Sequence, residues 1–244
     1  MKSIFKSLIS GKVASEGNPL TETTHVFDLP AYQRITESRL EHLRSLRLPF
    51  AGKSVIDVGS GIGRLAEFFD EQGCRTHCVD GREENITRLK ELYPNRTASV
   101  ADLETDDVLA LGQFDTVFCY GLLYHVIDVF GAVRRLGRLC REFAIIETCV
   151  SPVRDHVLFL APEKSSNPSQ ALRTYGSRPS PQFVTTCLRQ AGFTHLYAPK
   201  TLPDHEQFQW SFMNVGKWDQ NTLMRDIFIA AYEPMSNPNL VERS

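Results

Sequence analysis

Three glycines follow a short β-branched run within residues 54–64, which read Ser-Val-Ile-Asp-Val-Gly-Ser-Gly-Ile-Gly-Arg. They are Gly59, Gly61 and Gly63, and an acid, Asp57, stands two residues before the first of them. Glycines allow a sharp turn and let a ligand lie against bare backbone. A carboxylate at this position would not help a loop to bind pyrophosphate, which is itself negatively charged. It would suit a ligand that presents an ammonium group or ordered water. The segment predicts a strand, a ligand-binding turn and a helix.

The elements around this turn alternate between strands and helices. Strands are expected at 53–58, 75–79, 96–101, 114–119, 142–148, 193–197 and 226–231, and helices at 30–46, 65–72, 83–92, 126–140 and 181–190. This alternation predicts an α/β fold, a Rossmann-like, mostly parallel sheet of seven strands with helices on both faces. Ligands of such sheets bind at the carboxyl ends of the strands.

The remaining segments lack a convincing pattern. Residues 1–50 are expected to form an N-terminal extension and helix, and 51–244 a single ligand-binding domain. Within it, residues 150–180 and 199–218 show no convincing element and are expected to be substrate-facing, cap-like insertions, because long connections in compact domains are usually functional or mobile.

The composition is that of an ordinary globular chain. It has 244 residues, 42% of them hydrophobic, and a net charge of −2. This charge does not favour a nucleic-acid partner, although a local basic patch would still permit one. We expect neither a membrane span nor a signal peptide. The six cysteines form no C-x-x-C pair, which predicts reduced thiols in a cytoplasmic protein. Oligomeric state is not readable from the sequence.

The glycine turn and the acids after it carry a family resemblance. The spacing has the form D-x-G-x-G-x-G, and Arg64 occupies the place of the third glycine in a dinucleotide-binding fingerprint. Asp80 and Asp102 follow the next two strands. Together with the run from Phe114 to Val126, these features resemble the class I S-adenosylmethionine-dependent methyltransferases.

The resemblance implies roles for the residues at the strand ends. Asp80 would accept hydrogen bonds from the ribose hydroxyls of S-adenosylmethionine, Asp102 would meet the adenine amino group, and residues 120–122 would lie beside the methionine part. No catalytic metal is expected, because Cys119 and Tyr120 stand where metal-dependent relatives place a carboxylate. The complete set of expected cofactor-binding residues is Asp57, Gly59, Ser60, Gly61, Gly63, Asp80, Gly81, Arg82, Asp102, Leu103, Tyr120 and Leu122.

Candidates for catalysis follow from the chemistry of methyl transfer. A sulfonium methyl is already activated, so an enzyme chiefly aligns the acceptor, and a hydroxyl acceptor also gains from a base. The candidates are His125 first, because imidazole titrates near neutral pH, then His205 and Glu147. Each has a structural alternative: a helix-start histidine for His125, a solvated loop residue for His205 and a turn cap for Glu147. Substrate contacts are expected from Tyr124, Tyr175 and Trp210.

The sequence thus predicts methyl transfer to a hydroxyl of a small molecule or glycan. Three alternatives remain open: a tRNA-modifying enzyme of the wobble-uridine type, a Rossmann dehydrogenase, and a non-catalytic module that binds S-adenosylmethionine.

Overall fold

The computed structural model describes residues 26–211, 218–219 and 221–243, so the expectations for residues 1–25 lie outside it. The helices are α2 (Pro30–Leu46), α3 (Glu67–Glu71), α4 (Glu83–Leu92), α5 (Val129–Leu139) and α6 (Pro181–Gln190), with short 3-10 turns η1 (Val26–Asp28), η2 (Asp106–Leu111), η3 (Leu123–His125) and η4 (Glu206–Phe208). The strands are β1 (Ser54–Val58), β2 (Arg75–Asp80), β3 (Thr97–Val100), β4 (Phe114–Tyr120), β5 (Cys140–Cys149), β6 (Leu158–Pro162), β7 (Tyr175–Pro179), β8 (His195–Pro199), β9 (Arg225–Ala231) and β10 (Leu240–Glu242).

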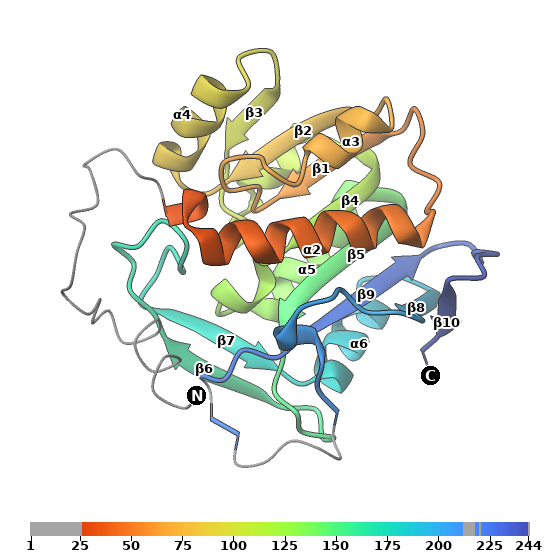
Figure 1. The fold of residues 1–244 in the computed structure, drawn as a ribbon. Coiled ribbons are helices and arrows are strands. Elements are labelled where there is room, and N and C mark those ends of the chain that lie inside the picture. Colours follow the sequence, from red (N-terminus) through yellow and green to blue (C-terminus); the bar gives the residue numbers. More distant parts are fainter. Residues whose placement is uncertain (1–25, 212–217, 220, 244) are drawn as a thin grey trace.

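The central sheet has the order β10-β8-β9-β5-β4-β1-β2-β3 (Figure 1). Strands β1 to β5 pair with one another in parallel, whereas the β5–β9, β9–β8 and β8–β10 pairs are antiparallel. The chain leaves β3 at one edge and returns at β4 beside β1, so the direction of strand order reverses between β1 and β4. Ligand sites of such sheets form at this point of reversal.

The Rossmann-like fold is confirmed, but the expected count of seven strands is wrong. The sheet has eight strands, because Leu240–Glu242 adds β10 to the edge of β8. A strand of three residues is too short to show the alternation of hydrophobic and polar residues that identifies strands in a sequence.

Residues 150–180 also differ from the expectation of no regular element. They contain a separate antiparallel hairpin in which β6 pairs with β7, set apart from the central sheet (Figure 1). The apolar run from Val157 to Ala161 is its sequence signal, and the surrounding proline, serine and arginine residues hide it. The loop between the two strands, residues 163–174, lies beside the candidate site described below.

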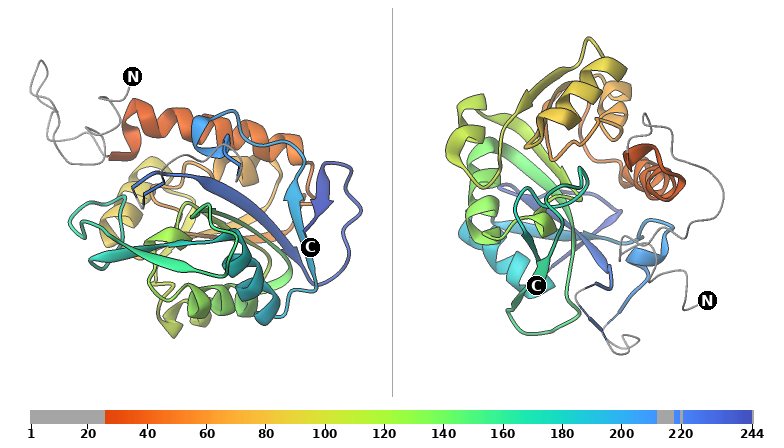
Figure 2. Two further views of the ribbon diagram at one scale, coloured as in Figure 1. Left: turned by 90° about the horizontal axis from the view of Figure 1, so that it is seen from below. Right: turned by 90° about the vertical axis from the view of Figure 1, so that its left-hand side faces the viewer.

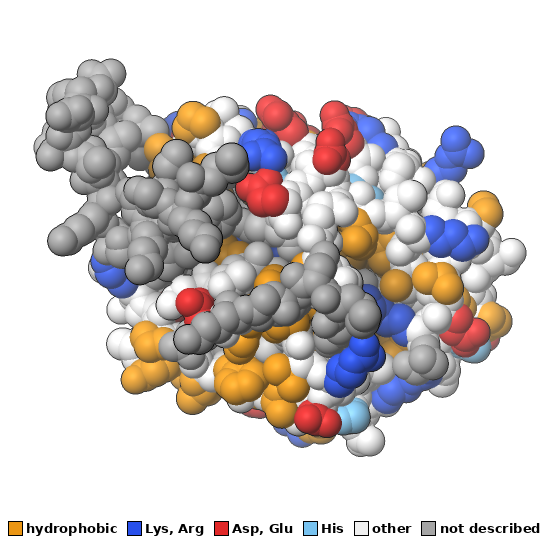
Figure 3. Space-filling view, turned by 60° about the horizontal axis from the view of Figure 1, so that its bottom comes forward, with side chains coloured by type: hydrophobic (Ala, Val, Ile, Leu, Met, Phe, Trp, Pro, Cys, Tyr) orange, Lys and Arg blue, Asp and Glu red, His pale blue; other side chains and the backbone are white. Residues whose placement is uncertain are grey.

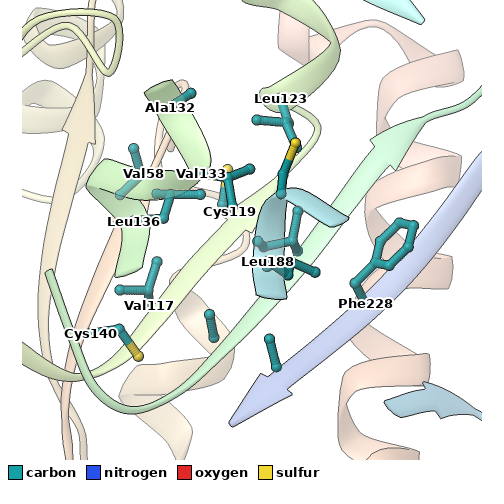
Figure 4. Packing of buried hydrophobic residues seen from close by; sticks show 14 of the residues in the cluster. Val58, Val117, Cys119, Leu123, Ala132, Val133, Leu136, Cys140, Leu188 and Phe228 are labelled. Carbon is teal, nitrogen blue, oxygen red and sulfur yellow. The ribbon is translucent and has the colours of Figure 1, made fainter. Parts of the chain in front are cut away.

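Side chains alternate between two hydrophobic cores, one on each face of the sheet. On β4, Val117 and Cys119 face the core under α5 and α6, whereas Phe118 faces the core under α2 and α3. Figure 4 shows the first core, with Leu136 of α5 and Leu188 of α6 against the strands. The views in Figure 2 place α2 on one side of the sheet and α5 and α6 on the other.

Helix α2 has the bounds that the sequence predicts. Pro30 stands at its first position, where a missing backbone N–H costs nothing, and Arg47 after it adopts a left-handed φ of 51°. Its buried stripe includes Ile35, Leu43 and Leu46, but also a cation, Arg39. Packing the apolar stripe on the sheet therefore carries a buried arginine toward the strand ends.

Among the described helices, none is both long and apolar enough to cross a bilayer. The face shown in Figure 3 carries hydrophobic side chains and charges of both signs.

Candidate cofactor and acceptor site

One cavity lies at the carboxyl ends of β1 to β4. Its lining comes from the glycine turn after β1, from the residues that follow β2, β3 and β4, from α2, and from loop 163–174. Segments far apart in the chain therefore meet at the ligand-binding edge that the strand alternation predicts.

The glycine turn has a backbone that other residues cannot adopt without strain. Gly59, Gly61 and Gly63 have φ values of 80°, 55° and 80°. A Cβ on Gly59 would lie 2.6 Å from the Cβ of Leu122. The turn is tied to the next strand, because the backbone N–H of Gly59 donates to the carbonyl of Val79 at 2.7 Å. The cavity wall is therefore bare main chain.

Asp80 binds the glycine turn through its carboxylate. Oδ2 accepts a hydrogen bond from the backbone N–H of Gly61 at 2.9 Å. Oδ1 accepts one from the backbone N–H of Arg82 at 2.9 Å and one from the side-chain amide of Asn85 at 3.0 Å. Burial raises the pKa of Asp80, while these hydrogen bonds act in the opposite direction. The carboxylate thus borders the cavity and holds its turn in place.

Asp102 borders the cavity at the end of β3. Its Oδ1 accepts the backbone N–H of Glu104, and its Oδ2 accepts a hydrogen bond from Arg173, each at 2.9 Å. Arg173 belongs to loop 163–174, so an ion pair joins this loop to the strand end. Leu103 is buried beside the acid.

Asp57 is a buried acid of β1 that does not itself line the cavity. It is 2% exposed, and its Oδ2 has no hydrogen-bond partner. Burial raises the pKa of this carboxyl from 3.8 to about 7. An orphaned buried carboxylate beside a glycine turn is the kind of acceptor that an ammonium group or an ordered water would satisfy.

Loop 163–174 roofs the cavity. One nitrogen of Arg82 donates to the backbone carbonyls of Ser165, Gln170 and Ala171 at 2.9, 3.1 and 2.9 Å. The hydroxyl of Tyr32 on α2 donates to Ser169 at 2.8 Å. The roof is therefore fastened to both sides of the cavity.

His125 lines the cavity and has an acidic partner from the roof. Its Nδ1 lies 2.5 Å from Oε2 of Glu163, which also accepts the backbone N–H of Ala171 at 2.8 Å. Burial lowers the pKa of His125, while the hydrogen bond to Glu163 acts to raise it. Glu163 was not a predicted site residue, because nothing in its local sequence sets it apart from other loop acids.

Glu147, a candidate base from the sequence with a turn cap as its alternative, lies between two arginines. It is fully buried, with Oε1 accepting from Arg225 at 2.6 Å and Oε2 from Arg39. Burial alone would raise the pKa of Glu147, but the two guanidinium groups hold it below its ordinary value. Arg225 also donates to the hydroxyl of Tyr124 at 3.1 Å. Arg39, Arg225 and Tyr124 all line the cavity.

Residues 32–198 match the family described as Methyltransferase domain. The chain belongs to this family. The prediction of a class I S-adenosylmethionine-dependent methyltransferase is therefore confirmed, and S-adenosylmethionine as cofactor is supported at the level of the family.

Relatives and solved structures agree with this assignment. The ubiquinone biosynthesis O-methyltransferase of Xanthomonas euvesicatoria is 36% identical over 110 residues, which cover 42% of this chain and 44% of the relative. The chain thus spans less than half the length of the curated relatives it matches.

Solved structures share the fold. The N-terminal domain of EvdMO1 with SAH bound has a TM-score of 0.60 at 19% identity, with 80% of each chain covered. Magnesium protoporphyrin IX methyltransferase from Synechocystis with bound SAM has a TM-score of 0.53 at 16% identity, with 83% of this chain and 80% of that one covered.

Six predicted site residues do not line the cavity: Asp57, Gly63, Glu147, His205, Tyr175 and Trp210. His205 is 5% exposed and its Nδ1 accepts the backbone N–H of Gln207, so it caps η4 and is not a solvated loop residue. Trp210 donates its ring N–H to the backbone carbonyl of Arg225 at 2.8 Å. Tyr175 lies on β7 with 44% of its surface exposed.

The described residues hold no group of three or more His, Cys, Asp or Glu side chains arranged to bind a metal.

Proposed function

We propose that this chain transfers the methyl group of S-adenosylmethionine to an oxygen of a small molecule or glycan, with His125 as the general base. The single observation that carries the proposal is that His125, oriented by Glu163, lines the same cavity as the glycine turn. The acceptor and the base are proposals, whereas membership of the methyltransferase family is a finding.

The cavity fits the cofactor. Gly59 and Gly61 line it with main chain, Asp80 ends β2 in position for the ribose hydroxyls, and Asp102 follows β3 in position for the adenine amino group. Asp57, two residues before the turn, has a buried oxygen without a hydrogen-bond partner, which an ordered water would satisfy. S-adenosylmethionine supplies an activated methyl group when bound, so the protein must hold and deprotonate the acceptor.

His125 has the properties of a base that acts at neutral pH. A hydrogen bond from Nδ1 to the Glu163 carboxylate keeps the proton on that nitrogen and leaves Nε2 with its lone pair. Burial lowers the pKa of the imidazole, so the neutral form predominates at pH 7. Nε2 is then available to accept the proton of an acceptor hydroxyl as its oxygen attacks.

The activities named for related proteins support an oxygen acceptor. The curated relatives that share part of this chain are ubiquinone biosynthesis O-methyltransferases. One structure of the EvdMO1 N-terminal domain was determined in the presence of SAH and D-fucose, which agrees with a sugar-sized acceptor. Neither name assigns a substrate to this chain, so the acceptor must be found by assay.

The test separates binding from catalysis. We would measure S-adenosylhomocysteine binding by calorimetry, and methyl transfer to a panel of phenols and sugars, for the wild type and for His125→Gln. Because base catalysis contributes roughly 10²- to 10⁴-fold, turnover should fall by that order while cofactor affinity stays unchanged.

The matched control is His156→Gln, because His156 is exposed. This variant should bind S-adenosylhomocysteine and transfer the methyl group as the wild type does. Full turnover in His125→Gln would remove this residue as the base, and failure to bind S-adenosylhomocysteine in the wild type would overturn the proposed function itself.

A further inference from the structure

Arg96 immediately precedes β3, and its side chain reaches the glycine turn that follows β1. Its Nη1 donates to the backbone carbonyl of Gly63 at 2.8 Å. The side chain keeps only 6% of its surface exposed, and arginine is almost never buried to this degree unless it is paired. Arg96 was not a predicted site residue, and no step of the proposed methyl transfer uses it.

Three segments meet at this guanidinium group. Its Nη2 forms an ion pair with Asp70 on α3. Its central carbon lies 3.9 Å from the centre of the ring of Tyr93, the residue that follows α4. A guanidinium presents several N–H donors in one rigid plane, so it can hold several partners at once. Helix α3 and the end of α4 thus fix Arg96, and its Nη1 is directed at the turn.

The peptide that Arg96 binds closes the part of the turn that borders the cavity. The backbone N–H of Gly63 donates to the carbonyl of Ser60 at 2.9 Å. Residues 60–62 line the cavity, whereas Gly63 and Arg96 do not. A Cβ on Gly63 would lie 3.1 Å from Nη1 of Arg96, so a glycine here lets the guanidinium approach closely. Arg96 therefore fixes one end of the ligand-binding backbone without touching the ligand.

The other side-chain anchor of the turn has a second task. Asp80 accepts the backbone N–H of Gly61, but it is also the acid expected to bind the ribose hydroxyls. Arg96 has no such competing partner in the cavity. Its charge also acts on the acid before the turn: burial raises the pKa of Asp57 to about 7, and Arg96 acts in the opposite direction.

We propose that Arg96 is a positioning residue for the cofactor, which holds the carbonyl of Gly63 so that the turn has its ligand-binding shape before S-adenosylmethionine arrives. The inference rests on the proposed function, because it takes this cavity as the cofactor site. A turn that is already ordered raises affinity, since binding then does not have to order it. Arg96 acts through Gly63 and contacts neither the cofactor nor the acceptor.

The experiment titrates the full chain with S-adenosylhomocysteine by calorimetry, which gives both the Kd and the number of sites per chain. In Arg96→Gln we expect the Kd to rise at least tenfold while the number of sites stays the same. A residue that served only for stability would reduce the folded fraction, and so the number of sites, without changing the Kd. That second result, or wild-type binding in Arg96→Gln, would overturn the inference.

Further variants separate the contact with the turn from packing on α3. Arg96→Lys keeps the charge but loses the planar set of donors, so its Kd should lie between those of the wild type and Arg96→Gln. Asp70→Asn breaks the ion pair on α3 and should change the Kd less than threefold, whereas a loss as large as in Arg96→Gln would overturn the inference. Arg75→Gln is the matched control, because Arg75 is exposed and donates to the carbonyl of Gly52 instead.

Hydrogen exchange reads the order of the turn directly. The backbone amides of Gly61 and Gly63 are both hydrogen-bonded, and in ligand-free Arg96→Gln they should exchange at least tenfold faster, with the amides of α6 unchanged. Wild-type exchange at the turn would overturn the inference. This measurement uses no ligand, so its failure is distinct from that of the proposed function, which fails if the wild type does not bind S-adenosylhomocysteine.

Thermal unfolding would establish that each variant is folded. If Arg96→Gln does not fold, Arg96→Lys takes its place in both measurements, with an expected threefold to tenfold rise in Kd. Wild-type affinity and exchange in Arg96→Lys would then overturn the inference.

Discussion

Oε2 of Glu163 lies 2.5 Å from Nδ1 of His125, although the two residues are 38 positions apart in the chain. His125 ends the 3-10 turn η3 after β4, whereas Glu163 follows β6 of the separate hairpin. The carboxylate is itself fixed, because Arg178 lies 3.4 Å from its other oxygen. The imidazole of the proposed base therefore has a defined tautomer before any acceptor binds.

The pH dependence of methyl transfer should report this pair. Burial holds the pKa of His125 below its ordinary value of 6.5, and Glu163 acts to raise it. Protonated imidazole cannot accept a proton, so kcat should be flat above pH 7 and fall on the acidic side. In Glu163→Gln the acidic limb should move to lower pH, and the plateau should drop about tenfold to a hundredfold. A limb that stays in place would contradict the assignment.

The glycine turn should be sensitive to a single added methyl group. In Gly61→Ala the new Cβ would lie 3.0 Å from the ring of Phe27, at a φ of 55°. Gly73→Ala is the control, because its φ is 66° and nothing lies within 4 Å. Both should lose about 1–2 kcal/mol of stability from left-handed strain. Only Gly61→Ala should also weaken S-adenosylhomocysteine binding in calorimetry, and equal affinities would refute the role of the turn.

Asp80→Asn should weaken cofactor binding by roughly tenfold to a hundredfold. Both carboxylate oxygens of Asp80 accept N–H groups, so the amide nitrogen of Asn would face a donor whichever way it points. Hydrogen bonds to a charged group contribute about 1.5–3 kcal/mol, which sets this range. Calorimetry with S-adenosylhomocysteine measures the loss. The exposed Asp107→Asn should bind like the wild type, and an unaltered Asp80→Asn would count against this residue.

Asp57 should make the cofactor-free protein less stable as pH rises. In the folded chain its carboxyl keeps its proton up to about pH 7, whereas in the unfolded chain it ionises near 3.8. The folded state therefore binds more protons between these values, and stability falls by up to about 4 kcal/mol as pH rises through this window. Asp57→Asn should remove this slope. Urea unfolding of the wild type and of Asp57→Asn between pH 5 and 8 would measure the free energy of unfolding at each pH. If this free energy changed with pH in the same way for both proteins, the prediction would be wrong.

The strand ends of the site were accessible from sequence because parallel strands bring their carboxyl ends together. An acid after each strand, such as Asp80 and Asp102, therefore appears in the pattern of the chain itself. The sequence singled out Glu147 as a candidate residue near the end of β5, but it did not predict the two arginines that bind it. Alternation along β5 puts it on the same face as Ile145, which is the face that α2 covers. Its two arginine partners come from distant elements.

Contacts between segments that are distant in the chain could not be predicted from the sequence pattern. Glu163 and Arg225 have no periodic pattern that links them to His125 or Glu147, and only the tertiary fold brings them together. The hairpin β6–β7 was missed because its short apolar run lies among residues typical of loops. The helix bounds of α2 and α6 were predicted well, since proline and a buried apolar stripe mark them.

The position of Glu163 has a consequence for the timing of the reaction. The loop that starts at this residue forms the roof of the cavity, whereas His125 lines the cavity from the turn after β4. Any displacement that lifts the roof to admit or release a ligand also withdraws the carboxylate from the imidazole. With the loop displaced, the proposed base would lack the partner that orients it, so enclosure of the reactants and orientation of the base would become a single event.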